Sequence, residues 1–177
     1  FTTSGTIDGT TSGQETLSVD VSQDNTGAAS DGNIIFSDTG NVVRLGDIAL
    51  TAQDGTITLN DSSNATRDGA DTNAEVLIDG GSVTMTGIVI LTANTVIDTE
   101  LDADANAGAV DLSDATITTD NNNSTFHTLS IDTSTDGTTD THGAVDLGDI
   151  DDADGAGTSN GYLGGVTVTT TDGNGTA

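Results

Sequence analysis

Four residue types are missing from this chain of 177 residues: cysteine, proline, tryptophan and lysine. Because the chain has no cysteine, it has no disulfide framework. It also has no thiols from which the redox compartment could be inferred. No apolar run approaches the ~18 residues that a membrane-spanning helix needs. The sequence therefore excludes a disulfide scaffold and gives no sign of membrane insertion.

Positive charge is almost absent. Arg44 and Arg67 face 29 acidic residues, which gives a formal net charge of −27. Such a chain repels nucleic-acid phosphates and anionic lipid, so we expect neither as a partner. It attracts divalent cations, and self-repulsion destabilises its compact state unless salt or metal screens the charge.

Glutamate is scarce as well, with only Glu15, Glu75 and Glu100 among the acidic residues. Aspartate, asparagine, glycine and threonine favour turns and strand faces, whereas helices favour alanine, glutamate, lysine and leucine. The aliphatic residues recur at alternate positions in short runs, which argues against a wholly disordered chain. The composition predicts an all-β protein.

A short pattern, Gly-x-(Ile/Val)-x-(large apolar or Val)-x, occurs six times at start-to-start spacings of 21 to 35 residues. The six copies are GNIIFSD from Gly32, GTITLND from Gly55, GSVTMTG from Gly81, GAVDLSD from Gly108, GAVDLGD from Gly143 and GGVTVTT from Gly164. In one copy the alternation places Val110 and Leu112 on one face of a strand and Asp111 on the other. The leading glycine is predicted to allow a sharp bend or a positive φ.

One such strand cannot bury its apolar face, but stacked copies can, so the recurrence predicts a β-solenoid. At roughly 20–26 residues per coil and a ~4.8 Å rise, the chain would form about seven to nine coils, or about 35–45 Å of rod. Tandem β-sandwich modules are the alternative, because two modules of ~100 residues would fit. Sandwich cores use more aromatic anchors than Phe1, Phe36, Phe126 and Tyr162 provide, which favours the solenoid.

Three phrases, GDIALTAQDGTITLND, GIVILTANTVIDT and AGAVDLSDATI, resemble the repeats of filamentous-haemagglutinin-like adhesins and related giant bacterial β-strand-repeat surface proteins. The resemblance covers most of the chain. It implies a right-handed parallel β-helix, secreted across the outer membrane of a Gram-negative cell and displayed as a rod or fibre.

Two segments carry closely spaced oxygen side chains like those at the start of a calcium loop. These residues are Asp102, Asp104 and Asn106 in the first segment and Asp149, Asp151, Asp152 and Asp154 in the second. Neither segment follows the standard order of such a loop. They either bind Ca²⁺ or form solvated turns whose aspartates satisfy the backbone.

The sequence offers weaker candidates for catalytic residues than for calcium ligands. Asp111 and Asp146 occupy equivalent outward positions in two repeats, and stacked carboxylates would raise a pKa, as a general acid requires. His127 and His142 have no second histidine or cysteine at ligand spacing. Arg44 lies in an alternating strand and is expected to be exposed or paired with an aspartate. A polysaccharide-acting β-helix enzyme is therefore only the third hypothesis.

The sequence as a whole predicts a non-enzymatic extracellular structural protein, the rod-like segment of a bacterial surface adhesin or fibre. Residues 1–177 would form a single solenoid segment, and the start at Phe1 and the turn-like end DGNGTA suggest a mature product or a piece of a longer chain. Its partners would be neighbouring repeats or identical subunits end to end, and host-cell, surface or polysaccharide ligands. The second hypothesis is a self-assembling filament subunit.

Overall fold

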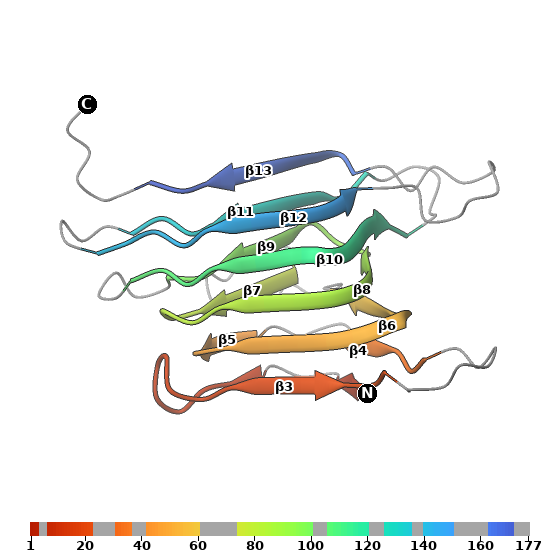
Figure 1. The fold of residues 1–177 in the computed structure, drawn as a ribbon, viewed down its shortest axis with the longest axis horizontal. Coiled ribbons are helices and arrows are strands. Elements are labelled where there is room, and N and C mark those ends of the chain that lie inside the picture. The colour runs from red at the N-terminus through yellow and green to blue at the C-terminus, as the bar shows by residue number, and fades with distance from the viewer. Residues whose placement is uncertain are drawn as a thin grey trace.

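The computed structural model of the chain describes residues 1–3, 7–22, 31–36, 42–60, 74–100, 106–120, 126–135, 140–150 and 163–171. These residues form thirteen strands in two layers (Figure 1). The described part of the chain contains no helix that could cross a membrane. The all-β prediction is confirmed.

The first layer, sheet A, has seven strands, in the order β1-β4-β6-β8-β10-β12 with β3 also pairing with β6. Its strands are β1 (Thr2–Thr3), β3 (Leu17–Asp20), β4 (Ile34–Phe36), β6 (Ile48–Leu59), β8 (Val83–Leu91), β10 (Val110–Thr119) and β12 (Val145–Ile150). The pairing register of the long strands shifts near their middle, between Thr51 and Thr56 in β6. Each long strand therefore carries two apolar runs rather than one.

The second layer, sheet B, has six strands in the order β13-β11-β9-β7-β5-β2. Its strands are β2 (Ile7–Asp8), β5 (Val42–Leu45), β7 (Ala74–Ile78), β9 (Thr95–Asp98), β11 (Thr128–Asp132) and β13 (Gly165–Thr169). From β4 onward successive strands alternate between the two sheets. Every strand pair is parallel, which contradicts the tandem-sandwich alternative, because sandwich sheets are antiparallel.

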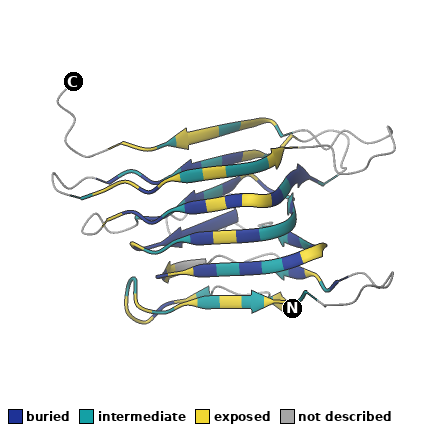
Figure 2. Cartoon of the chain, in the orientation of Figure 1, coloured by how far each residue is buried: buried dark blue, intermediate teal, exposed yellow. Residues whose placement is uncertain are grey.

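The core lies between the sheets and consists of aliphatic side chains stacked in register (Figure 2). In sheet A, Ile48 pairs with Val83 and Val83 with Val110, and all three are at most 2% exposed. In sheet B, Ile97 and Ile131 form an equivalent pair at 1% and 0% exposure. The expected alternation, apolar inward and polar outward, is therefore seen in β6, β8, β9 and β11, whereas all five residues of β7 are buried.

The stack is shorter and its turns longer than the spacing predicts. Paired residues lie 21 positions apart from Ala74 to Thr95 but 37 apart from Leu129 to Val166, rather than 20 to 26 throughout. Six strands follow one another along either sheet in the described residues, not seven to nine. Six strands span only about 24 Å along the stacking direction. The described stack is therefore shorter than the predicted rod.

The six sequence copies do not occupy one structural position. The copies from Gly81, Gly108 and Gly143 stack in the first half of the sheet A strands, where Asp111 pairs with Asp146. Those from Gly32 and Gly55 stack with each other in the second half, and the copy from Gly164 lies in sheet B. Counting copies from three columns together is one source of the uneven spacing, but within the first-half column the copies still start 27 and 35 residues apart.

Five glycines lie directly above one another at the turn that enters sheet A, and we call them the glycine column: Gly13, Gly46, Gly81, Gly108 and Gly143. A Cβ at Gly81 would lie 1.5 Å from the carbonyl oxygen of Gly46, and a Cβ at Gly108 would lie 1.5 Å from that of Gly81. The positive-φ glycines of the described residues are Gly13, Gly80 and Gly87. Of the two roles expected for the leading glycine, a positive φ is not observed at Gly81, Gly108 and Gly143, and close backbone contact is the reason for glycine there.

Candidate functional site

Beside the glycine column, successive turns form an open polar groove with a volume of about 520 Å³. We call it the turn groove. Its lining residues are Ser12, Gly13, Gln14, Gly46, Asp47, Asp79, Gly80, Gly81 and Asn106. It brings together residues from four successive turns of the chain, and its charged side chains are both aspartates.

Aspartate and asparagine side chains at the turns accept hydrogen bonds from the backbone of the neighbouring turn. Asp47 Oδ1 accepts from the Ser82 backbone N–H at 2.9 Å, and Asn106 Oδ1 accepts from the Thr141 N–H at 2.8 Å. Asn94 accepts in the same way from the next turn of sheet B. These bonds satisfy amides at strand starts that the sheet ladder leaves without partners. The abundance of Asp and Asn at the turns thus has a structural cause.

Buried threonines provide a second kind of link between turns. Thr99 Oγ1 donates to the carbonyl oxygen of Gly108, and Thr133 Oγ1 donates to that of Gly143, each at 2.9 Å. Both threonines are 0% exposed. Their hydroxyls satisfy carbonyl groups of the glycine column that are buried between the two sheets.

A recurring Asp-x-Ser turn lies at the end of β3 and near the start of β10. Asp20 Oδ1 accepts from both the N–H and the hydroxyl of Ser22, and Asp111 Oδ1 accepts from the same two groups of Ser113. The serine hydroxyl is the main cause that lowers the pKa of each aspartate below its ordinary value. Hydrogen bonds to the charged form favour that form.

We expect Ser113→Ala to raise the pKa of Asp111 toward its ordinary value, because the alanine keeps the backbone N–H but loses the hydroxyl. The folded-state pKa is depressed, so this turn stabilises the protein above the unfolded-state pKa and loses that effect as pH falls through the folded value. NMR titration of the Asp111 carboxyl carbon measures the change. Asp20, whose own turn is intact, is the internal control; an unchanged Asp111 titration would contradict the assignment.

The two residues of the proposed catalytic pair, Asp111 and Asp146, are stacked as expected, but the pKa of Asp111 is lowered rather than raised. Asp111 and Asp146 are register partners in β10 and β12. The pKa of Asp111 is lowered by Ser113 rather than raised by its neighbour, and the carboxylate is exposed. A general acid needs a raised pKa. The raised pKa expected from stacking two carboxylates is therefore not found at Asp111.

The residues predicted to bind calcium are mostly not described. Asp102 and Asp104 lie in 101–105, and Asp151, Asp152 and Asp154 lie in 151–162, both outside the described residues. Asn106 lines the turn groove. Asp149 lies exposed in β12. Within the described ranges no group of three or more His, Cys, Asp or Glu side chains is placed to hold a metal.

The remaining singled-out residues have ordinary partners. The Arg44 guanidinium forms an exposed ion pair with Asp8, with Nε 2.8 Å from Oδ1, which confirms the expectation for Arg44. His127 Nε2 lies 3.3 Å from Asp120 Oδ1. His142 is exposed, and Arg67 lies outside the described residues.

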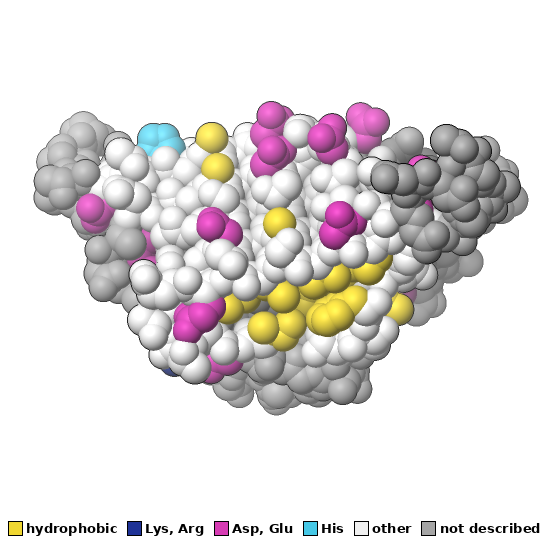
Figure 3. Space-filling model, turned by 60° about the horizontal axis from the view of Figure 1, so that its bottom comes forward, with side chains coloured by type: hydrophobic (Ala, Val, Ile, Leu, Met, Phe, Trp, Pro, Cys, Tyr) yellow, Lys and Arg dark blue, Asp and Glu magenta, His cyan; other side chains and the backbone are white. Residues whose placement is uncertain are grey.

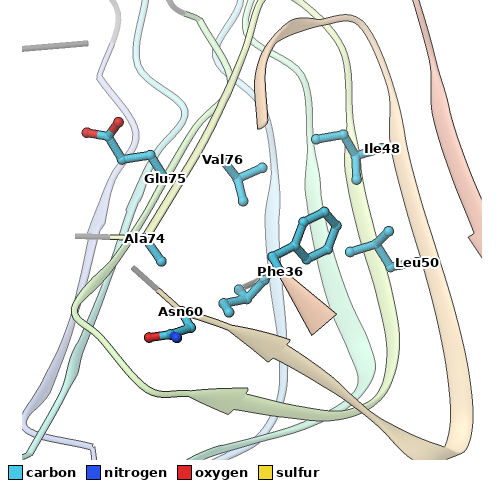
Figure 4. A pocket seen from close by; sticks show the side chains of 8 residues that line it. Phe36, Ile48, Leu50, Asn60, Ala74, Glu75 and Val76 are labelled. Atoms are coloured by element: carbon cyan, nitrogen blue, oxygen red, sulfur yellow. The ribbon is translucent and has the colours of Figure 1, made fainter. Parts of the chain in front are cut away.

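A second hollow lies inside the core, at the end of β4, and is lined by Phe36, Ile48, Leu50 and Val76 among others (Figure 4). Its volume of about 10 Å³ is close to that of one water molecule. The carboxylate of Glu75 points away from it in Figure 4. This hollow is a packing gap and is too small for an organic ligand.

Asp79 is the residue that sequence reasoning missed. It follows β7 in the phrase LIDGGS, outside both acidic segments, and belongs to no recognised motif. The structure places it on the wall of the turn groove with its side chain buried. The sequence offered one indication of this residue: an aspartate stands directly before Gly80 and Gly81, at the end of a strand in which polar and apolar residues do not alternate.

No family model, characterised protein or solved structure matches the chain. Its functional interpretation therefore rests on its own geometry.

Proposed function

We propose that this chain is a non-enzymatic structural module, one segment of a right-handed parallel β-solenoid that continues beyond each end face. The supporting observation is the burial along the stack: central strands are buried, whereas β3, β12 and β13 contain no fully buried residue. The acidic, threonine-rich flanks would keep such an assembly soluble and responsive to cations. Together with the phrases resembling bacterial adhesin repeats, this supports an extracellular surface fibre.

The path of the chain supports the solenoid and its handedness. In Figure 1 the sheet A strands nearer the viewer run to the right, the sheet B strands behind them run to the left, and the chain rises from the N-terminal to the C-terminal end. Upward progress with this sense of rotation is a right-handed winding. Right-handed connection is also the general rule for parallel strands.

Both end faces carry uncovered apolar side chains. At the first end Ile7, Leu17, Val19 and Val21 are only partly buried against the core. Figure 3, which brings this end forward, shows an apolar band across it. At the other end Ile150 and Val168 are 49% and 42% exposed. Parallel strand edges and apolar side chains at both ends are what stacking on a further β-coil would cover.

Two copies of the chain joined end to end in one polypeptide test this proposal. We expect the joined protein to melt at least about 5 °C above the single chain, because the two facing ends bury each other. Small-angle scattering should show growth along the stacking direction. Independent melting of two unchanged units would contradict the proposal.

The exposed ends also favour the second candidate, a subunit that polymerises by itself. Analytical ultracentrifugation of the single chain over a wide concentration range separates the two. Open-ended growth in mass would favour the filament, whereas a monomer at every concentration would exclude it and leave the segment of a longer chain.

A further inference from the structure

Among the residues that the structure describes, no basic side chain pairs with the buried Asp79 carboxylate. Asp79 is 8% exposed, and its Oδ1 has no hydrogen-bond partner among the residues that the structure describes. The sequence offers only two basic side chains, and Arg44 is paired with Asp8. A buried, unpartnered carboxylate oxygen is costly, so its presence points to a ligand.

This carboxylate lies at the turn groove. Asp79 Oδ2 is 3.6 Å from the position that a Cβ would take at Gly13, and the backbone oxygen of Asp79 is 2.6 Å from the same point. Gly13 and Asp79 both line the groove. The absence of a side chain at Gly13 thus keeps the space beside the carboxylate open.

The other groove residues include oxygen-bearing side chains. Asp47 is a second carboxylate whose Oδ1 accepts from Ser82, and Gln14 and Asn106 carry amide oxygens, that of Asn106 already accepting from Thr141. Calcium takes six to eight such oxygens, including waters, in flexible geometry, whereas magnesium demands a tight octahedron and dehydrates reluctantly. An open groove with two carboxylates and neutral oxygens fits calcium better.

We propose that the turn groove binds one calcium ion, with Asp79 as its buried carboxylate ligand and Asp47 as the second carboxylate. The ion would connect the turns that precede β3, β6 and β8. Its charge would offset the buried carboxylate and part of the surrounding negative field. This site differs from the two acidic segments recognised in the sequence, apart from Asn106, and does not depend on the proposed structural role.

Isothermal titration with calcium chloride tests the proposal, after chelator treatment and in about 0.15 M NaCl, which screens distant charges. The variants are Asp79→Asn and, as the matched control, Asp146→Asn, which makes the same charge change at an exposed position in β12. We expect one saturable site in the native chain, weakened at least about tenfold in Asp79→Asn and less than about twofold in the control. Magnesium chloride should bind more weakly.

Melting temperatures provide a second test, because non-specific screening of the negative charge by calcium would not produce the result expected for a specific site. In chelator, Asp79→Asn should melt at or above the native chain, because a buried charge has been removed. With calcium the order should reverse. Equal loss of binding in both variants, or no saturable site in the native chain, would overturn the proposal. If Asp79→Asn does not fold, Asp47→Asn decides: weakened calcium binding supports the site, and unchanged binding overturns it.

Discussion

Replacing Gly108 by alanine is expected to lower the free energy of unfolding by more than about 3 kcal/mol. The new Cβ would lie 1.5 Å from the carbonyl oxygen of Gly81 and 2.1 Å from its carbonyl carbon. Both atoms belong to the backbone, so no side-chain rotation can relieve the overlap. The turns that enter β8 and β10 would have to separate, and the parallel pairing that starts at Val83 and Val110 would weaken.

Gly165→Ala provides the matched control. Gly165 lies in β13, and a Cβ there would meet nothing within 4 Å. Its expected effect is within about 0.5 kcal/mol, since alanine also restricts the unfolded chain. Urea unfolding followed by circular dichroism measures both variants. Similar midpoints for the two would show that the glycine column does not constrain the stack.

Ile131→Ala is expected to cost about 2–5 kcal/mol, the usual range for truncating a buried isoleucine. Ile131 is 0% exposed and pairs in register with Ile97 on one side and Val168 on the other. Covered by strands on both sides, its site can collapse only partly after truncation. The cost therefore includes the residual cavity as well as the lost apolar burial.

The control is Val168→Ala, one strand along the same column. Val168 is 42% exposed because no described strand pairs beyond β13. Its truncation should cost about 1 kcal/mol or less in the isolated chain. The same urea experiment compares the two variants. Equal costs would mean that burial in this column does not depend on a covering strand.

Much of the fold is readable from the sequence because alternation of apolar and polar residues has a direct physical meaning. The segments GAVDLSD and GAVDLGD predict two strands that pair in register. Val110 pairs with Val145 and Leu112 with Leu147, as an alignment of the two segments predicts. The outward position of Asp111 follows from the same alternation. Local pattern is sufficient wherever one repeat stacks on its nearest copy.

The assignment of copies to columns is not readable in this way. GTITLND from Gly55 looks like GSVTMTG from Gly81, but the register of β6 shifts between Thr51 and Thr56, so Ile48 rather than Ile57 pairs with Val83. The shift appears only as a change of phase in the alternation, from buried even positions up to Ala52 to buried odd positions from Gly55, and that change does not say which neighbouring run each half pairs with. The reason for the leading glycines was also hidden, because a contact with the backbone of another turn is not a local property.

The turn groove lay beyond sequence reasoning for a similar reason. Asp79 and Asp47 are 32 positions apart and belong to different turns, so no spacing rule brings them together. The calcium prediction was based instead on the two segments with closely spaced acidic residues. Side chains that converge only through stacking can be found only once the register is known.

The alignment of the strands does not depend on the length of the connections between them. The connection between β8 and β9 has three residues, and that between β6 and β7 has fourteen, yet both flank strands held in the same register. Lengthening a connection costs little, since a doubling of its length adds only about 0.6 kcal/mol of closure entropy. Insertions and deletions in the connections can therefore change the surface of such a scaffold while its core stays the same. The outer face can vary in sequence and length without loss of the strand register.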